Sequence, residues 1–202
     1  MAKILVADAI AQKAIDSLEA SGYTVINKPT LAEADLVNEI NEVHVVLVTG
    51  KKVCKTSIES GRFLSLIIHV GNETNGVDVD AASEKGIFVC TSSDDGEEIH
   101  RIIHTYLQNG EAINCININA FPDACGIMTV RHTGVFGKIV GVLEKNNAKI
   151  KSARNLTLKG DKAQTCIIRM SAQACLGAEV AGIEGVIGIA GVPLQHCSAS
   201  GN

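Results

Sequence analysis

The fold is decided by the stretch from residue 126 to residue 170, which reads GIMTVRHTGVFGKIVGVLEKNNAKIKSARNLTLKGDKAQTCIIRM. Its opening run, Ile127 to Val130, is rich in residues that favour strands, and Gly134 after it suits a tight turn. Apolar residues then recur at helical spacing until two asparagines end that helix. Two further strand-like runs flank a Gly160-Asp161 turn, which predicts a β-hairpin.

A helix around Glu179 and a strand at residues 187–192 are expected after the hairpin. The order of elements is therefore βαββαβ, which predicts one sheet with two helices in a ferredoxin-like arrangement. Residues 124–194 resemble the ACT domain, a small regulatory module that binds amino acids at subunit interfaces. The resemblance rests on the strand, on the Gly134-Val135 turn that opens the helix, and on the strand that begins Ala148-Lys149-Ile150.

The first part of the chain alternates short apolar runs with helix-like segments. The runs of strand length lie at residues 3–8, 23–26, 43–48, 64–70 and 87–90. A helix capped by Thr30, with Glu33 three residues later, and a helix from Glu97 to Asn109 are among the segments between or after them. This alternation predicts an α/β domain with a parallel sheet, and right-handed crossovers favour a flavodoxin-like strand order.

Charge divides the chain at the same place as the pattern of elements. Residues 1–123 carry 9 Lys and Arg against 18 Asp and Glu, whereas residues 124–202 carry 9 against 4. We therefore predict a flavodoxin-like, substrate-binding-like domain at residues 1–122 and an ACT-like regulatory domain at residues 123–202. The asymmetry has two interpretations: two solvated surfaces of different bias, or a basic half that meets an anionic ligand or the acidic half.

Composition excludes some classes of protein. The chain of 202 residues has no Trp and only 3% aromatic residues, so its cores must be aliphatic. It has no apolar run of the ~18 residues that a membrane span needs. The N-terminus looks like a first strand and not like a signal peptide. Seven scattered cysteines favour a reducing compartment, so a cytoplasmic protein is expected.

The first half resembles the D-3-phosphoglycerate dehydrogenase family. The residues that carry this resemblance read KILVADAI, HVVLVTGKKV and LSLIIHVGNETNGVDVDAASEKGIFVCTSSDDG. The next segment, EEIHRIIHTYLQNGEAINCININA, resembles one that in these enzymes returns from the nucleotide-binding domain. The two pieces meet at Asp94-Asp95-Gly96, so the resemblance implies that the NAD-binding domain, with the family's catalytic Arg, Glu and His, is missing.

No Gly-x-Gly-x-x-Gly motif follows any strand, so no dinucleotide site is expected. Glycines 182, 185, 188 and 191 recur at a spacing of three, which fits a packed helix-to-strand connection better than a cofactor turn. No catalytic residue, cofactor or metal is therefore predicted.

The family's substrate loops are altered in this chain. Val48 and His69 stand where the family has Arg, and Glu73 would repel an acidic phosphoester. Lys51 and Lys52 could attract an anion, although paired lysines at a strand end are more often simply solvated. The positions that the resemblance marks as substrate-like are Thr49, Lys51, His69 and Gly71.

The ACT-like turn also departs from its family. Members that bind serine place His and Asn before a Pro-Gly, where this chain has Thr129, Arg131 and Thr133-Gly134. Arg131 and Lys149 near a helix N-terminus would make a site for an acidic amino acid or another carboxylate. The alternative is surface charge beside an empty relic pocket. The predicted ligand-binding residues are Arg131, Gly134, Val135, Phe136 and Lys149.

Two further groups allow a chemical interpretation. Glu97, His100 and His104 share one helical face, which would suit a metal, but no third ligand pattern accompanies the histidines and a solvated or interdomain face is favoured. Cys54 lies near three lysines that could lower its thiol pKa, but no base accompanies it, which favours an ordinary thiol.

The sequence therefore predicts a non-catalytic relative of phosphoglycerate dehydrogenase that binds an amino acid or carboxylate through its ACT-like domain and has a regulatory role. The alternative is a dehydrogenase fragment of serine biosynthesis that docks onto a separate NAD-binding chain. A homodimer is expected through residues 124–202, with Ile127 to Val130 as the edge strand. A full-length dehydrogenase is a further candidate partner. Nucleic acid is disfavoured, because no aromatic platform accompanies the basic residues.

Overall fold

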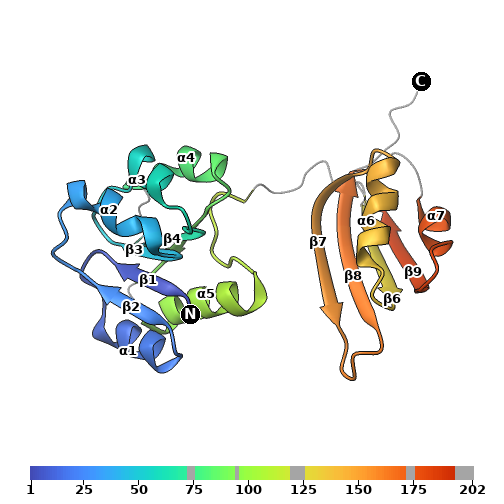
Figure 1. The fold of residues 1–202 in the computed structure, drawn as a ribbon, viewed down its shortest axis with the longest axis horizontal. Coiled ribbons are helices and arrows are strands. Elements are labelled where there is room, and N and C mark those ends of the chain that lie inside the picture. Colours follow the sequence, from blue (N-terminus) through green and yellow to red (C-terminus); the bar gives the residue numbers. More distant parts are fainter. Residues whose placement is uncertain (72–75, 94–95, 119–125, 172–175, 194–202) are drawn as a thin grey trace. The chain divides into compact units, whose positions relative to one another are not determined.

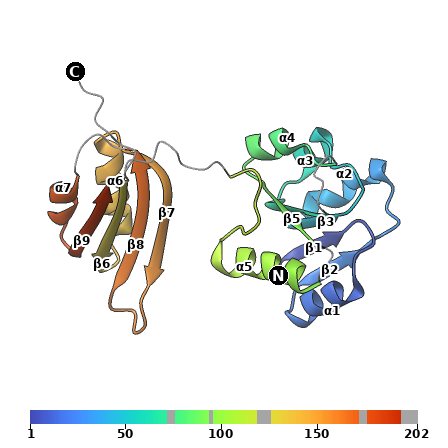
Figure 2. The same ribbon diagram turned by 180° about the vertical axis from the view of Figure 1, so that it is seen from behind.

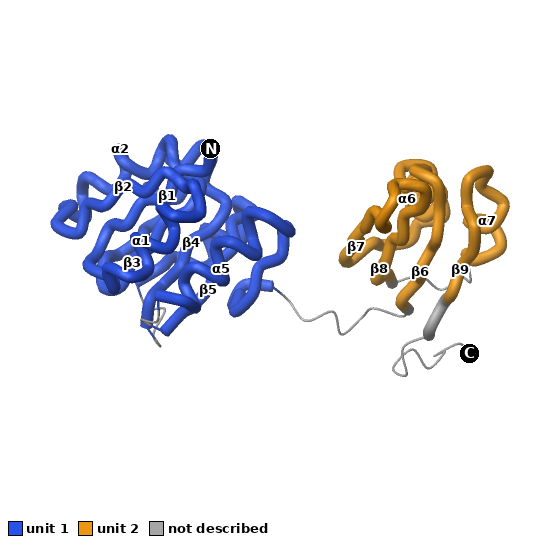
Figure 3. The backbone as a smooth tube through the Cα atoms, turned by 90° about the horizontal axis from the view of Figure 1, so that it is seen from below, with its two compact units in different colours: residues 1–119 blue, residues 120–202 orange. Residues whose placement is uncertain are grey.

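The computed structural model describes residues 1–71, 76–93, 96–118, 126–171 and 176–193 (Figure 1). The chain forms two compact units, residues 1–119 and residues 120–202 (Figure 3). Each unit has its own sheet, with two buried apolar clusters in the first unit and one in the second. No helix within the described ranges is long and apolar enough to cross a membrane.

The first unit is built on five parallel strands in the spatial order β2-β1-β3-β4-β5. Their bounds are β1 Lys3–Val6, β2 Thr24–Asn27, β3 Val45–Val48, β4 Leu66–Val70 and β5 Phe88–Ser92. This is the flavodoxin-like order, so the predicted fold class is confirmed. Every residue of β3 and β4 is buried, because helices cover both faces of the sheet.

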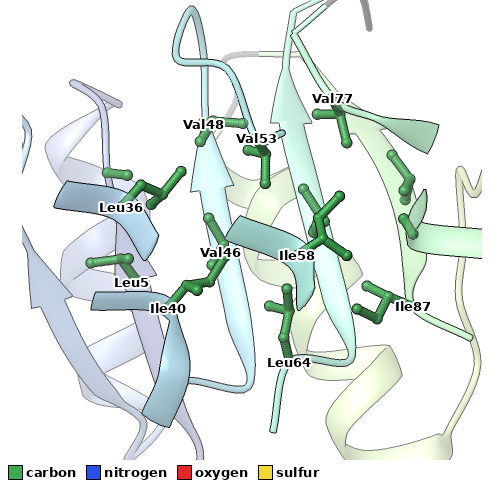
Figure 4. Close-up of a cluster of buried hydrophobic side chains, with 14 of the residues drawn as sticks. Leu5, Leu36, Ile40, Val46, Val48, Val53, Ile58, Leu64, Val77 and Ile87 are labelled. Carbon is green, nitrogen blue, oxygen red and sulfur yellow. The ribbon is translucent and has the colours of Figure 1, made fainter. Parts of the chain in front are cut away.

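Two helix layers enclose this sheet (Figure 2). Helices α1 (Gln12–Ala20) and α5 (Gly96–Asn109) pack on one face. Helices α2 (Leu36–Glu39), α3 (Lys55–Ser60) and α4 (Val79–Glu84) lie on the other. On that second face the aliphatic side chains of the helices and of β3 meet in one cluster, shown in Figure 4. The core is aliphatic, as the composition predicts.

The segment predicted as a helix capped by Thr30 differs from the expectation. It consists of a 3-10 turn η1 (Glu33–Asp35), the one-turn helix α2, and a second 3-10 turn η2 (Ile40–Glu42). No side-chain cap is formed at η1, whose N-cap is Ala32. Leu36 and Ile40 are both fully buried, so the segment is held by these two apolar contacts and not by a capping box.

Helix α5 packs on the sheet, as the sequence predicts, with Ile99, Ile102 and Ile103 fully buried. It begins against α1: a Cβ added at Gly96 would lie 2.8 Å from the backbone nitrogen of Ala14. Only a glycine allows two helix backbones to approach so closely. The expected surface loop at Asp94-Asp95 lies outside the described residues.

The second unit has the predicted βαββαβ order. Its elements are β6 Gly126–His132, α6 Phe136–Lys145, β7 Lys149–Thr157, β8 Gln164–Ser171, α7 Gly177–Ala181 and β9 Val186–Pro193. The sheet is antiparallel in the order β7-β8-β6-β9. Both helices contribute buried residues to a single cluster on one face of the sheet. The opposite face carries the exposed side chains of Arg131 and Ile167.

The expectation that Ile127 to Val130 forms an edge strand is wrong. These residues belong to β6, which pairs with β8 on one side and with β9 on the other. The strands β7 and β9 are the edges. The first strand of this topology becomes central because the last strand returns beside it, which a local pattern does not reveal.

The close approach at Gly96 gives a test of the fold. Gly96→Ala should lower the free energy of unfolding of the first unit by about 1–3 kcal/mol, because the new methyl group meets backbone that cannot move freely. Gly50→Ala is the matched control, since its Cβ would meet nothing within 4 Å. Urea denaturation followed by circular dichroism measures both. Equal stability of the two variants would contradict the described packing of α5 on α1.

Candidate functional site

The carboxyl ends of the parallel strands form the edge where ligands bind in open α/β sheets. From β1 the chain passes to β2 on one side, and it then crosses to β3 on the other side of β1. The direction of strand addition therefore reverses between β1 and β3, and this is the switch point of the sheet. The residues that follow these two strands are Asp8 on one side and Thr49, Gly50 and Lys51 on the other. The side chain of Asp8 occupies this point.

The Asp8 carboxylate is fully engaged by the loop after β3. Its Oδ2 atom accepts the backbone N–H groups of Thr49, Gly50 and Lys51 at 2.9, 3.1 and 2.9 Å. Its Oδ1 atom accepts the Lys51 ammonium at 2.6 Å, and the Asp8 and Lys51 side chains are only 12% and 13% exposed. Burial by itself raises the pKa of Asp8, but these hydrogen bonds outweigh it and lower the pKa to about 2.

Thr49 and Lys51 lie at the expected edge, but their donors are turned inward. Consecutive amide N–H groups beside an ammonium are a typical anion-binding arrangement. In this chain the bound anion is the protein's own carboxylate. The charge of Lys51 is already paired within the fold, and binding of an external anion by Lys51 stays a prediction.

The two positions where the family has Arg are side by side and buried. Val48 is paired in register with His69, and both are at most 6% exposed. The Nδ1 atom of His69 is buried without a hydrogen-bond partner in the described part of the chain. A Cβ at Gly71 would lie 3.8 Å from that nitrogen, so the unpaired atom is close to Gly71. Glu73, predicted to repel a phosphoester, lies outside the described residues.

An open, polar cavity of about 400 Å³ lies next to Gly71, at the ends of β4 and β5. Its lining residues are Gly71, Thr91, Ser92, Ser93, Glu98 and Asn114. Of the predicted substrate-like residues, only Gly71 is among them. The remaining lining residues were missed, although two serines at the end of a buried strand are a recognisable signal for a polar site at a sheet edge.

Glu98 is the charged group of this cavity. Its Oε2 atom accepts the Ser93 amide at 2.8 Å and the Ser93 hydroxyl at 2.6 Å, and its Oε1 atom accepts the Asn114 side-chain amide at 2.9 Å. The Ser93 hydroxyl and amide are the main cause of a lowered pKa at Glu98. The cavity therefore presents hydroxyl groups and an ionised carboxylate, which suits a ligand with hydroxyl or ammonium groups better than an acidic one.

The face of α5 that carries Glu97, His100 and His104 connects this helix to its neighbours. Glu97 forms an ion pair with Lys13 at 2.6 Å. The imidazoles of His100 and His104 lie within hydrogen-bond distance of the Ser21 hydroxyl and the Tyr23 hydroxyl, at 2.8 and 3.0 Å. Within the described residues no group of three metal-binding side chains occurs. These contacts give the residues a structural role in holding α5 to α1 and β2.

Cys54 has a depressed thiol pKa of about 7, for a different reason from the one predicted. The hydroxyls of Thr56 and Ser57 at the start of α3 hydrogen-bond to its sulfur and stabilise the thiolate. The lysines that motivated the prediction are not the cause.

In the second unit, Arg131 and Lys149 do not share a site. Arg131 is paired with Thr165 of β8, whereas Lys149 is paired with Ser171 of the same strand. Six residues of β8 separate these positions, or about 20 Å. The two cations also lie at opposite ends of α6. Their expected juxtaposition is therefore wrong within one copy of the chain, because it ignored the register of the hairpin.

The turn before α6 is organised by the buried His132. Its Nδ1 atom accepts the Val135 amide at 3.2 Å, and its Nε2 atom contacts the Asn155 side-chain oxygen at 3.0 Å. The Phe136 ring stacks on the His132 ring. Gly134, with φ of +82°, is exposed, and so is Gly137. The Val135 amide therefore already donates a hydrogen bond to His132. Gly134 lies two residues before α6 and Gly137 is its second residue, so neither carries a side chain that would cover the start of the helix.

Residues 4–99 match the family model for the D-isomer specific 2-hydroxyacid dehydrogenase catalytic domain. The D-3-phosphoglycerate dehydrogenase of Methanocaldococcus jannaschii is 36% identical over 95 residues, which cover 46% of this chain and 18% of that protein. The enzyme of the same name from Synechocystis is 33% identical over 93 residues, covering 46% and 17%. The NAD⁺-bound 3-phosphoglycerate dehydrogenase structure from Entamoeba histolytica has a TM-score of 0.41 at 23% identity, over 45% of this chain and 32% of that one.

The family model and the two curated relatives confirm the resemblance to the dehydrogenases for the first unit, where all of residues 4–99 lie. The chain spans about a fifth of the length of the curated relatives it matches. The resemblance of residues 124–194 to the ACT domain stays a prediction.

The Asp8 carboxylate should make stability depend on pH in the acid range. Because its pKa is about 2 in the folded chain and 3.8 when free, its contribution is complete above pH 4 and is lost as the pH falls from about 4 to about 2. Asp8→Asn should abolish this loss, which is about 2 kcal/mol. The free energy of unfolding by urea, measured at several pH values, tests it. Asp16→Asn, at an exposed carboxyl on α1, is the control, and a parallel pH profile for wild type and Asp8→Asn would contradict the ion pair.

Proposed function

We propose that this chain is a non-catalytic, ligand-binding relative of the D-3-phosphoglycerate dehydrogenases. The observation that carries the proposal is the Asp8 carboxylate in the cradle of amide and ammonium donors at the switch point. A phosphorylated hydroxy acid would have to displace a buried ion pair to use these donors, and breaking such a pair typically costs several kcal/mol. The neighbouring cavity adds Glu98, which repels an anion.

In this proposal, the second unit binds a small amino acid or another carboxylate. The ferredoxin-like sheet and the exposed turn before α6 support this site, because amide groups at a helix N-terminus favour a carboxylate. Arg131 is exposed one strand residue before His132, which orders the turn. Lys149 is not part of this site within one copy. Ligand binding here would give the chain a regulatory role.

The proposal includes a homodimer that forms through the second unit. Because β6 is a central strand, the interface is assigned to the edge strand β7. β7 pairs only with β8 within its sheet, and most of its residues are exposed. Pairing of two β7 strands about a two-fold axis would join the two sheets. It would also bring the Lys149 residues of both copies to the seam region. Sedimentation velocity on the full chain tests this: a monomer at every concentration would rule it out.

A second candidate function is a dehydrogenase fragment that needs a separate NAD-binding chain. The match of residues 4–99 to the dehydrogenase family favours it. The two candidates differ in one assay, oxidation of 3-phosphoglycerate in the presence of NAD⁺ and a nucleotide-binding dehydrogenase chain. Activity that depends on adding the present chain would support the fragment. Oxidation by the present chain alone would contradict both candidates.

Ligand binding at the turn before α6 can be tested by thermal shift. A screen of serine, aspartate, glutamate and simple dicarboxylates should contain a ligand that stabilises the chain by about 2.7 kcal/mol at 100 times its dissociation constant. Gly137→Val should abolish the shift, because its side chain projects over the first turn of α6 into space that is open in the structure. Gly141→Val, one turn later in equally open space, is the matched control and should keep it. A shift that survives Gly137→Val would place the ligand elsewhere.

A further inference from the structure

Two cysteines face each other at the outer edge of the parallel sheet. Cys90 lies in β5, the edge strand, and Cys115 lies in the segment that runs antiparallel beside it. The Thr91 amide donates to the Asn114 carbonyl at 3.1 Å, and the Ile116 amide donates to the Val89 carbonyl at 2.8 Å. These two bonds flank the cysteines, so Cys90 and Cys115 form a non-hydrogen-bonded antiparallel pair.

The geometry of such a pair permits a disulfide. Opposite residues at non-hydrogen-bonded positions have Cα atoms about 4.5 Å apart, within the range of about 4.4–6.8 Å found in disulfides. The Cys115 thiol donates to the Asn117 side-chain oxygen at 3.1 Å. Both cysteines are free in this structure. We propose that Cys90 and Cys115 are a dithiol oxidation site, at which a hydroperoxide converts the two thiols to an intramolecular disulfide.

The two thiols have complementary reactivity. Cys115 is partly exposed, and its contact with the Cys90 thiol, assisted by nearby backbone amides, lowers the pKa of Cys115. Cys90 is fully buried, and the same contact together with burial raises its pKa. Cys115 is therefore the thiolate that meets an oxidant from solvent, and Cys90 is the thiol that resolves the product.

The reaction proceeds in two balanced steps. The Cys115 thiolate attacks one oxygen of the hydroperoxide: an S–O bond forms, the O–O bond breaks, and the leaving alkoxide takes up a proton to become an alcohol, or water when the oxidant is hydrogen peroxide. Cys90 then attacks the Cys115 sulfenic acid, so that an S–S bond forms, the S–O bond breaks, and the Cys90 proton leaves with hydroxide as water. The two thiols lose two electrons, and the peroxide gains them.

The site is connected to the polar cavity. Thr91 and Ser92 follow Cys90 directly and Asn114 precedes Cys115, and all three line the cavity. The Asn117 side chain holds the same segment to β5, because its Oδ1 atom accepts the Val89 amide at 2.9 Å. A disulfide would attach this wall of the cavity covalently to the sheet edge. Oxidation would therefore fix the relative positions of Asn114 and Ser92.

The experiment uses the reduced chain of 202 residues and hydrogen peroxide at a small molar excess. Remaining thiols are then alkylated, and the unreduced digest is examined by mass spectrometry. We expect a linked peptide pair containing Cys90 and Cys115, its disappearance after dithiothreitol, and a rise of roughly 5–10 °C in the unfolding midpoint of the first unit. The rate of linkage should rise with pH below the ordinary thiol range, because the lowered pKa of Cys115 gives a larger thiolate fraction there.

Three variants separate this site from the other thiols. Cys115→Ser and Cys90→Ala should each abolish the linked pair and the rise in the unfolding midpoint. Cys115→Ser keeps the buried core intact, so it remains informative if Cys90→Ala does not fold. Cys54→Ser is the matched control: it removes an exposed thiol of lowered pKa whose neighbours are hydroxyls, and it should leave the linkage unchanged. Sulfinic acid at Cys115, or a disulfide from Cys115 to any cysteine other than Cys90, would overturn the proposal.

Discussion

The ion pair between Asp8 and Lys51 determines what the edge of the parallel sheet can bind. A carboxylate buried to this extent is stable only when its lone pairs are satisfied, and the loop after β3 supplies three amides and an ammonium for that purpose. The same four donors are the groups that an anionic ligand would need at the switch point. The interaction therefore ties β1 to β3 and removes the strongest anion-binding feature of this edge.

Polar chemistry in the first unit consequently lies further along the sheet, at the ends of β4 and β5. The cavity there is lined by hydroxyl groups, by Asn114 and by the ionised Glu98. Behind its wall lies the thiol pair of Cys90 and Cys115, where an antiparallel segment covers the outer edge of β5. The cavity residues Ser92 and Asn114 lie within two residues of Cys90 and Cys115 along the chain. A covalent change at the thiol pair would therefore alter the position of the cavity wall. The unpaired Nδ1 atom of His69 lies close to the same cavity, beside Gly71.

Much of the fold could be predicted from local pattern. Short aliphatic runs identified the strands of both units, because burial on both faces leaves continuous apolar sequences and burial on one face leaves alternating ones. The centrality of β6 could not be predicted in this way, since it depends on where β9 returns. The capping motif at Thr30 failed because Leu36 and Ile40 anchor that segment through tertiary packing.

The site was predicted less completely, because its interactions join residues that are distant in sequence. Lys51 was identified as a cation at a strand end, but its partner Asp8 lies 43 residues earlier. Arg131 and Lys149 were grouped by their distance along the chain from one helix, whereas the hairpin register places them at opposite ends of the sheet. Residue types were recognised correctly in both cases, and it was the pairing in space that local reasoning could not supply.

The central claim is that the chain's own carboxylate fills the donor cradle at the switch point. Backbone amide NMR on the isotope-labelled full chain, titrated with 3-phosphoglycerate, tests it most directly. The account predicts that the amide resonances of Thr49, Gly50 and Lys51 stay unchanged in the wild type, because their protons remain bonded to Asp8. Saturable shifts of these three resonances in the wild type would contradict it, since they would show that an external anion takes the place of Asp8.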